Sequence, residues 1–304
     1  MKQKREKTNT LHNKKHSRKT KHERRVSRVF LMPSLLGVLL FFILPFGVII
    51  YYSLVDNPIS AEFVGLENYQ TVIQNLAFRT AVKNTAVFSA FSVPLAVILS
   101  LGLAIMLDAK LPFRSQFRTF FLSPMMVPVA SIVLIWQVLF HYNGVVNEFL
   151  GRFGIDKIDF MKSEYSILVV VILFLWKNLG YNMILFMAAL GSIPKDIIEV
   201  ARLESANAFQ IFFKIKVRYL SSSILFVTIM SLINSFKIFR EVYLLTTDHP
   251  TDYVYMLQHY MNNKFKNLDY QMLSSAAILM SLVMIVIIGI LFFAENRFGK
   301  DVEG

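Results

Sequence analysis

The stretch 199-EVARLESANAFQIFFKI-215 decides the fold, because it is charged and helix-forming yet lies between two of the most apolar runs of the chain. Its first part belongs to the segment 192-SIPKDIIEVARLESA-206, which predicts a helix that begins at Ser192. Pro194 would occupy the first turn, and Asp196 would lie near the positive end of the helix dipole. An ordered polar segment between two apolar runs indicates a specific function rather than an unstructured linker.

The predicted helix is amphipathic. Four apolar residues share one face at helical spacing, namely Ile193, Ile197, Val200 and Ala201. A turn at 205–207 then leads into 209-FQIFFKIKVRYL-220, which continues into the next apolar run, so the loop predicts a helix–turn–helix. The alternative is an amphipathic helix lying on lipid headgroups. Glu199 and Glu204 are poor partners for an anionic leaflet, so the pattern favours a protein partner.

Apolar runs dominate the rest of the chain. Of its 304 residues, 55% are hydrophobic and 17% are charged, which points to a bilayer as the solvent. Six runs are long enough to cross a hydrocarbon core of about 30 Å, which takes about 20 helical residues. They lie at 29–54, 84–107, 120–140, 166–187, 219–239 and 275–294. Because the runs lack the period-two alternation of a membrane barrel, the sequence predicts an all-α integral membrane protein with six transmembrane helices.

The basic residues set the orientation of these spans. With the N-terminus inside, the inner segments hold 22 Lys and Arg residues, and the outer loops 55–83, 141–165 and 240–274 hold 8. Positive charge therefore collects on the cytoplasmic side, which places both termini inside. Two outer segments, 63-FVGLENYQTVIQN-75 and 144-GVVNEFLGRFGI-155, predict short amphipathic helices that either cap the bundle or receive a soluble partner.

Residues 1–28 form a separate basic region. They contain 12 of the 32 Lys and Arg residues and lack apolar periodicity, so they predict a disordered cytoplasmic tail. A nucleic-acid-binding arm would interleave aromatic and basic residues, and no aromatic residue precedes Phe30. We therefore expect the tail to fix the topology against anionic lipid, with no nucleic acid partner. Residues 29–298 are predicted to form one transmembrane domain.

Composition disfavours several kinds of chemistry. The chain has no cysteine, which excludes disulfides and thiolate metal sites. The pair Gly299–Lys300 lacks the earlier glycine of a phosphate loop. An integral-membrane enzyme would need clustered acidic residues or histidines at the membrane face, and an ion-coupled secondary transporter would need carboxylates within its spans. The predicted spans contain no Asp or Glu, and no such cluster occurs, so both alternatives are disfavoured.

The inner loop resembles the pattern E-A-A-x-x-x-G that continues to F-x-x-I-x-x-P. The matching residues are Glu199, Val200, Ala201, Glu204, Ser205, Ala206, Phe212, Ile215 and Arg218. Further stretches extend the resemblance over 29–298, among them 64-VGLENYQTVI-73, 118-RTFFLSPMMVPVASIVLIWQVLF-140 and 234-NSFKIFREVYLLT-246. On these residues the chain is similar to the permease subunits of binding-protein-dependent ABC importers. Within them it resembles the sugar-type branch for maltose, multiple sugars or glycerol phosphate.

Three positions depart from that pattern. Ser205 replaces its glycine, Arg218 replaces its proline, and Glu204 stands where the family has aspartate. Glycine permits a turn with positive φ. Asn207, two residues on, tolerates this conformation better than most residues, so we expect it to take over the turn.

The resemblance implies a type I importer permease fold, N-in and C-in, whose coupling loop at 192–216 sits in a cleft of a separate ATPase. The residues implied for this contact are Ile197, Glu199, Ala201, Glu204, Ser205 and Ala206. ATP and Mg are then used by two copies of the ATPase, and the chain itself is no enzyme and binds no cofactor or metal. The implied partners are a second, related permease chain, an extracellular or periplasmic sugar-binding protein and membrane lipid, in a bacterial cytoplasmic membrane.

The resemblance also implies a substrate pathway through the fourth and fifth spans. It maps onto Leu179, Gly180, Met183, Ser231, Asn234, Ser235 and Ile238. The last four share one helical face, and neutral hydroxyl and amide groups suit a sugar. The alternative is that these serines and asparagines only join helices. Lys177, halfway along its span, is predicted to face a cavity or a partner helix, with pairing to backbone carbonyls as the alternative, and Lys237 to reach the outer interface.

Overall fold

The computed structural model describes residues 26–108, 114–246 and 250–298, and each named element within these ranges is a helix. Most of the predicted basic tail, 1–25, lies outside the described residues. The first described helix already includes Val26, three residues before the predicted start of the first span.

Five long apolar helices and one bent pair account for the six predicted spans. The five are Val26–Ser53, with η1 (Leu39–Ile43) and α2 (Leu44–Ser53); α4 (Leu76–Asp108); α8 (Ser166–Gly191); Ser221–Thr246, with α12 (Ser221–Phe236) and α13 (Phe239–Thr246); and α15 (Tyr270–Phe298). The bent pair is α5 (Arg114–Met126) and α6 (Val129–Leu139), which meet at 100°. The all-α architecture is confirmed. The predicted span at 120–140 corresponds to the bent pair, and the predicted end of the fifth span at 239 is too early, because that span reaches Thr246.

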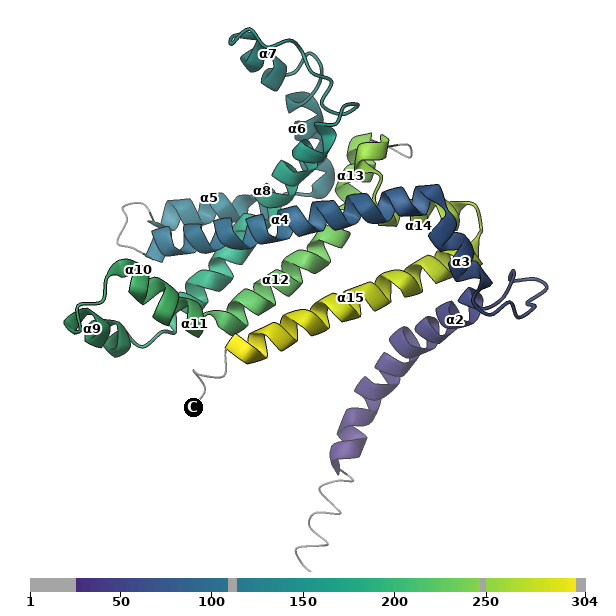
Figure 1. The fold of residues 1–304 in the computed structure, drawn as a ribbon, viewed down its shortest axis with the longest axis horizontal. Coiled ribbons are helices and arrows are strands. Elements are labelled where there is room, and N and C mark those ends of the chain that lie inside the picture. Colours follow the sequence, from purple (N-terminus) through teal and green to yellow (C-terminus); the bar gives the residue numbers. More distant parts are fainter. Residues whose placement is uncertain (1–25, 109–113, 247–249, 299–304) are drawn as a thin grey trace, which may run out of the picture.

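Short helices fill the loops at both ends of the bundle. The inner loop holds α9 (Lys195–Leu203), α10 (Ala208–Gln210), η2 (Ile211–Lys216) and α11 (Val217–Tyr219). The outer loops hold α3 (Glu67–Gln74), α7 (Val145–Gly151), η3 (Asp252–Val254) and α14 (Leu257–Lys266). Figure 1 shows α9 and α10 at the same end as the C-terminus, while α3 and α14 lie at the opposite end. This arrangement agrees with the predicted placement of the C-terminus on the side of the inner loop.

Prolines explain the bend between α5 and α6. Pro128 is the N-cap of α6, with extended backbone angles of φ −56° and ψ 138°. Pro124 lies inside α5 and has no N–H for the carbonyl of Phe120 four residues earlier. The Ser123 hydroxyl donates to that carbonyl at 2.8 Å, which satisfies the group that the proline leaves free. The sequence therefore breaks this span at a defined point.

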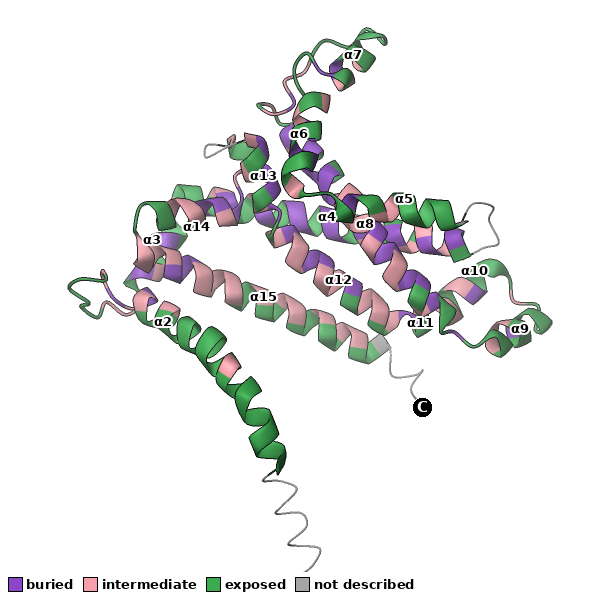
Figure 2. Cartoon of the chain, turned by 180° about the vertical axis from the view of Figure 1, so that it is seen from behind, coloured by how far each residue is buried: buried purple, intermediate pink, exposed green. Residues whose placement is uncertain are grey.

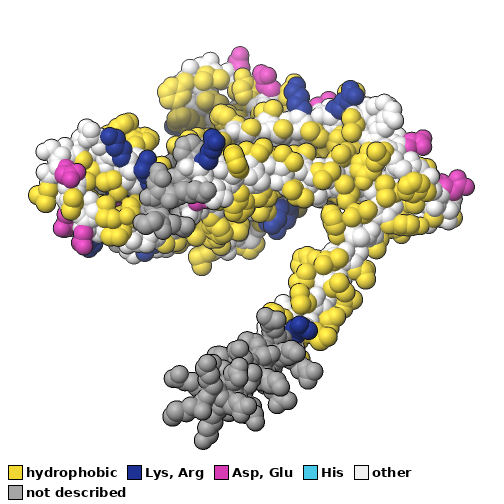
Figure 3. All heavy atoms as spheres, turned by 60° about the horizontal axis from the view of Figure 1, so that its bottom comes forward, with side chains coloured by type: hydrophobic (Ala, Val, Ile, Leu, Met, Phe, Trp, Pro, Cys, Tyr) yellow, Lys and Arg dark blue, Asp and Glu magenta, His cyan; other side chains and the backbone are white. Residues whose placement is uncertain are grey.

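The buried core lies between α4, α8 and α12. The rings of Phe88 on α4 and Phe174 on α8 meet edge to face with centroids 5.5 Å apart. Figure 2 shows buried residues concentrated on these helices, whereas the first span is almost entirely exposed. In Figure 3 hydrophobic side chains cover much of the surface shown, including that of the first span. Apolar surface of this extent belongs against lipid or other membrane helices.

Candidate functional site

The inner loop presents α9 at its tip. The helix begins at Lys195 with Pro194 as its N-cap, so the predicted start at Ser192 is three residues early. Asp196 lies in the first turn and Arg202 in the last, where each charge suits the helix dipole. The structure thus confirms a helix–turn–helix in the loop.

The loop divides its apolar residues between its interior and its surface. Of the six predicted ATPase-contact residues, Ala201 is buried within the loop, Ile197 and Ala206 are half-buried, and Glu199, Glu204 and Ser205 are exposed. The most exposed apolar side chains are Leu203 at 85% and Phe209 at 69%. These two residues are not among the sequence-predicted contacts, although their apolar character in a polar loop was a visible signal.

The turn after α9 is a Schellman motif with serine at the position that usually holds glycine. The Ala206 N–H donates to the Ala201 carbonyl at 2.9 Å, and the Ser205 N–H donates to the Arg202 carbonyl at 3.0 Å. Ser205 itself has a φ of +62°. The expectation that Asn207 takes over the left-handed position is therefore wrong.

Asn207 has a different structural role in the same turn. It is the N-cap of α10, with φ −75°. Its Oδ1 accepts the Gln210 N–H at 2.8 Å, and Gln210 Oε1 accepts the Asn207 N–H at 2.9 Å. This capping box fixes the start of α10, so the two halves of the turn are held by different residues.

Replacing Ser205 with glycine should stabilise the loop by about 1 kcal/mol, because serine in the left-handed region pays a steric cost that glycine does not. Hydrogen exchange of the amides in 199–211 should slow in Ser205→Gly. The matched control is Ser192→Gly, at the C-cap of α8, where φ is −84° and there is no left-handed strain to relieve. Equal or faster exchange in Ser205→Gly would contradict the strain at this turn.

A polar cavity of about 720 Å³ lies among the broken spans. Its lining comes from the α5–α6 bend, α8, the α12–α13 junction and α14. The polar and charged residues of this lining are Lys177, Asn178, Tyr181, Asn234, Lys237, Arg240, Glu241 and Gln258. Such a set of neutral amides, a phenol and charges inside an apolar bundle makes this the candidate substrate pocket.

Two contacts organise this pocket. Asn234 Nδ2 donates to Asn178 Oδ1 at 2.9 Å, which joins α12 to α8. Lys177 Nζ forms an ion pair with Glu241 Oε1, and Arg240 Nη2 lies 3.5 Å from the same oxygen. Lys177 therefore pairs with a carboxylate, and the predicted pairing with backbone carbonyls is wrong. The prediction missed Glu241 because the fifth span was ended at 239, whereas its helix continues to Thr246.

The predicted pathway residues fall into two groups. Asn234 and Ile238 line the pocket. The other five are absent from its lining, namely Leu179, Gly180, Met183, Ser231 and Ser235. Ser231 accepts from Asn182 at 2.9 Å, and the hydroxyls of Ser235 and Ser89 lie 2.8 Å apart, so these serines join helices. Gln258 and Arg240 had no sequence signal, because only the fold brings their segments to the pocket.

Gly180 is a site of close backbone approach. A Cβ added there would lie 1.9 Å from the Phe121 carbonyl oxygen and 2.5 Å from the carbonyl carbon. Since Phe121 belongs to α5, the glycine lets α5 and α8 touch directly. This packing contact fixes the position of α5, the first half of the bent span, against α8.

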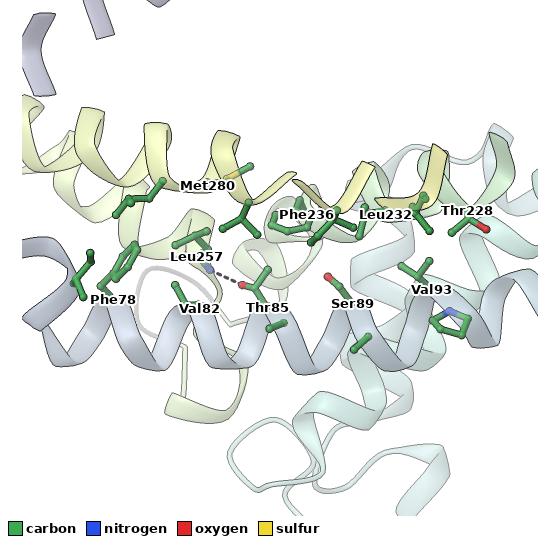
Figure 4. Close-up of a pocket in the computed structure, with 18 residues that line it drawn as sticks. Phe78, Val82, Thr85, Ser89, Val93, Thr228, Leu232, Phe236, Leu257 and Met280 are labelled. Carbon is green, nitrogen blue, oxygen red and sulfur yellow. Dashed lines mark hydrogen bonds between the residues drawn. The ribbon is translucent and has the colours of Figure 1, made fainter. Parts of the chain in front are cut away.

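A second cavity, of about 580 Å³, lies between α4, α12 and α15 and has a different character (Figure 4). Its lining is apolar apart from three hydroxyl side chains, and all three are engaged. The Leu257 N–H donates to Thr85 Oγ1 at 2.8 Å, Ser89 bonds to Ser235, and Thr228 donates to the Ile224 carbonyl at 2.7 Å. This cavity suits a hydrocarbon chain or a membrane helix rather than a hydroxylated substrate.

His259 lies in the outer loop region and is 2% exposed. Its Nδ1 accepts the Met256 N–H at 3.1 Å, and its ring meets Phe239 edge to face with centroids 4.6 Å apart. Its Nε2 has no hydrogen-bond partner within the described part of the chain. Burial lowers the pKa of His259 to about 4, so the imidazole is neutral in the fold.

Lowering the pH from 7 to 5 should cost about 2 kcal/mol of stability through His259, because its pKa rises to about 6.5 on unfolding. In this window the unfolded chain binds the proton and the folded chain does not, so stability falls as the pH falls. The measurement is the thermal midpoint in detergent at both pH values. His259→Gln should reduce the difference, and His141→Gln, at an exposed position, should leave it unchanged. An undiminished pH effect in His259→Gln would contradict this assignment.

Comparison with known proteins agrees with this architecture. Residues 92–303 match the model of the family described as the binding-protein-dependent transport system inner membrane component. A relative in Pectobacterium atrosepticum, the sn-glycerol-3-phosphate transport system permease protein UgpA, is 28% identical over 268 residues, covering 86% of this chain and 90% of that protein. The trehalose/maltose transport system permease protein MalF of Thermococcus litoralis is 27% identical, covering 92% and 96%.

A solved structure has the same fold. A chain of the bacterial alginate ABC transporter, in complex with a periplasmic protein bound to an alginate pentasaccharide, superposes with a TM-score of 0.80 at 20% identity, covering 93% of this chain and 98% of that one. The family match spans more than half of the sequence and includes the inner loop, the pocket helices and the last span. The chain therefore belongs to the family of inner membrane components of binding-protein-dependent transport systems.

Proposed function

We propose that this chain is the permease subunit of an ATP-driven importer that moves a carbohydrate or a related polyol into the cytoplasm after delivery by an external binding protein. The polar pocket among the broken spans carries the proposal. Its amides and its Tyr181 phenol can donate to and accept from hydroxyl groups, as a sugar requires. The two relatives belong to transport systems for sn-glycerol-3-phosphate and for trehalose/maltose, which supports the same class of substrate.

The inner loop is the proposed site of energy input. Its exposed side chains include Leu203, Phe209 and Glu199, a mixture of apolar surface and charge that suits a cleft on another protein. In this proposal α9 sits on a separate ATPase that binds ATP and Mg, and this chain binds no cofactor. Because α8 runs directly into the loop, a displacement of α9 moves the wall of the pocket.

The remaining partners follow from the exposed surfaces and from the family. The first span has none of its apolar window buried, so it faces lipid or a second membrane chain. We propose a related permease chain as that second subunit, with two copies of the ATPase inside and a sugar-binding protein outside. The family is one of multi-pass inner membrane components, and a bacterial cytoplasmic membrane is the proposed location.

The test is extraction of the tagged chain from its native membranes in mild detergent, followed by mass spectrometry of the co-purifying proteins. A second permease and a phosphate-loop ATPase are expected. Recovery of the chain alone in repeated extractions would contradict the importer and favour a secondary transporter. Glu241 is the carboxylate such a transporter would use, but its pairing with Lys177 speaks against a free ion-coupling role.

A further inference from the structure

Glu241 is an almost fully buried carboxylate at the edge of the polar pocket. The residue is 3% exposed, and Val242 and Leu245 on the same helix, with Ile238 just before it, are also buried. A buried carboxylate is costly unless it is paired, and Lys177 of α8 supplies the partner. Arg240 contributes at 3.5 Å but is itself largely exposed, with 66% of its side chain accessible.

The ion pair is the polar part of a contact between α8 and α13 that also includes apolar side chains, because Val242 shares a buried cluster with Phe174 and Leu245 shares another with Leu173. Lys177 lies on α8, which runs into the inner loop and α9. Glu241 lies on α13, which is fixed to α6 by Gln137, whose Nε2 donates to the Leu244 carbonyl at 3.2 Å. The pair therefore ties the α6–α13 unit to α8 across the polar pocket, since both of its members line that pocket.

The junction between α12 and α13 is a weak point in its helix. The Ile238 N–H reaches the Ser235 carbonyl at 3.4 Å, and the Arg240 N–H reaches the Lys237 carbonyl at 3.5 Å, both at the long limit of a hydrogen bond. Long bonds at a helix break mark a place where the chain can bend. Rotation at this junction would separate Glu241 from Lys177 without disturbing α12.

Stability alone does not account for an ion pair in this position. An apolar pair of the same volume would hold two buried helices at least as well, without the cost of desolvation. An ion pair differs because its strength depends on water: it is strong in a dry pocket and weak in a hydrated one. A contact of this kind can release when the pocket opens.

We propose that Lys177 and Glu241 form a latch that closes the pocket along α13, and that this latch separates when ATP drives the pocket open. The latch rests on the proposed function, because the driving motion comes through α9. Lys177 and Glu241 are then positioning residues: they set the gap between α8 and α13, while the amides and the phenol remain the groups that face a substrate.

The absence of cysteine from the chain allows a direct test. Spin labels are placed on Ile172→Cys in α8 and Leu244→Cys in α13, two exposed positions outside the pocket lining. The complex co-purified in mild detergent is measured without nucleotide and after trapping with ATP and vanadate. The wild-type chain without introduced cysteines gives the background from its partners. The latch predicts that the distance grows by about 2 Å or more on trapping, as expected for helix shifts.

Two double variants separate a latch from a passive contact. Lys177→Met with Glu241→Leu removes the charges, so the gap should stay closed in both states. Lys177→Glu with Glu241→Lys reverses the pair and should open as the wild type does. A wild-type distance that does not change, or an apolar pair that opens normally, would overturn the latch. ATP hydrolysis by the same complex reports on the proposed function separately, because it requires the ATPase and not the distance change.

Discussion

Replacing Gly180 with alanine should lower the stability of the protein by about 3 kcal/mol or more, since the new methyl group meets backbone rather than a flexible side chain. The Cβ would stand 1.9 Å from the Phe121 carbonyl oxygen, a separation that no rotamer change can relieve. α5 and α8 would have to move apart, and the pocket wall formed by the α5–α6 bend would move with them. The measurements are the yield of folded chain in mild detergent and its thermal midpoint.

Gly191→Ala is the matched control, because it adds the same methyl group to the same helix. Nothing lies within 4 Å of the position that its Cβ would take. Alanine there should be neutral or stabilising by up to about 1 kcal/mol, because glycine is the weaker helix former. A Gly180→Ala protein as stable as its parent would contradict the close approach of α5. If that stable protein had lost transport, the pathway role predicted for Gly180 from the sequence would be favoured instead.

The sequence predicted the apolar segments better than it predicted contacts inside the bundle, such as the close approach at Gly180. Hydropathy was sufficient to predict the number and approximate position of the apolar segments, because lipid imposes length and polarity on every span. The same reasoning identified the inner helix–turn–helix from its amphipathic spacing. These properties depend on local composition, which a single sequence displays directly.

The interior of the bundle depended on information that local composition does not carry. Ser231 and Ser235 share a face with Asn234, but that face meets both α8 and α4, and only Asn234 reaches the pocket. The pairing of Lys177 with Glu241 joins residues 64 positions apart across a break in the fifth span. Spacing along one helix gives the face of a residue, whereas the packing of three helices decides whether that face holds neighbours or a cavity.

The prediction for the turn after α9 was wrong for a different reason. The resemblance implied a turn in which a glycine can adopt a positive φ, and asparagine tolerates this conformation better than serine. Asn207 was nevertheless needed at the N-cap of α10, where its side chain bonds to Gln210. Ser205 therefore bears the strain.

Reversing the charge at Glu199 should release the ATPase while leaving the permease folded. In Glu199→Arg the amount of co-purifying ATPase should fall about thirtyfold, which corresponds to a loss of about 2 kcal/mol for one partner of an interfacial charge pair. Glu199→Ala should give a smaller loss, because it removes an attraction without adding a repulsion. Glu199 is exposed on α9 and has no ion-pair partner within the described part of the chain, so neither change disturbs a contact inside the fold.

The control is Glu164→Arg, an equal change of charge at an exposed position in the outer loop between α7 and α8. It should leave the ATPase bound, because that loop lies on the other side of the membrane from α9. Quantitative mass spectrometry of the extracted complexes gives the ratio of ATPase to permease in each variant. An unchanged ratio in Glu199→Arg would show that α9 does not use this carboxylate to hold the ATPase. A restored ratio, when a basic residue of the ATPase cleft is made acidic, would identify the partner of Glu199 directly.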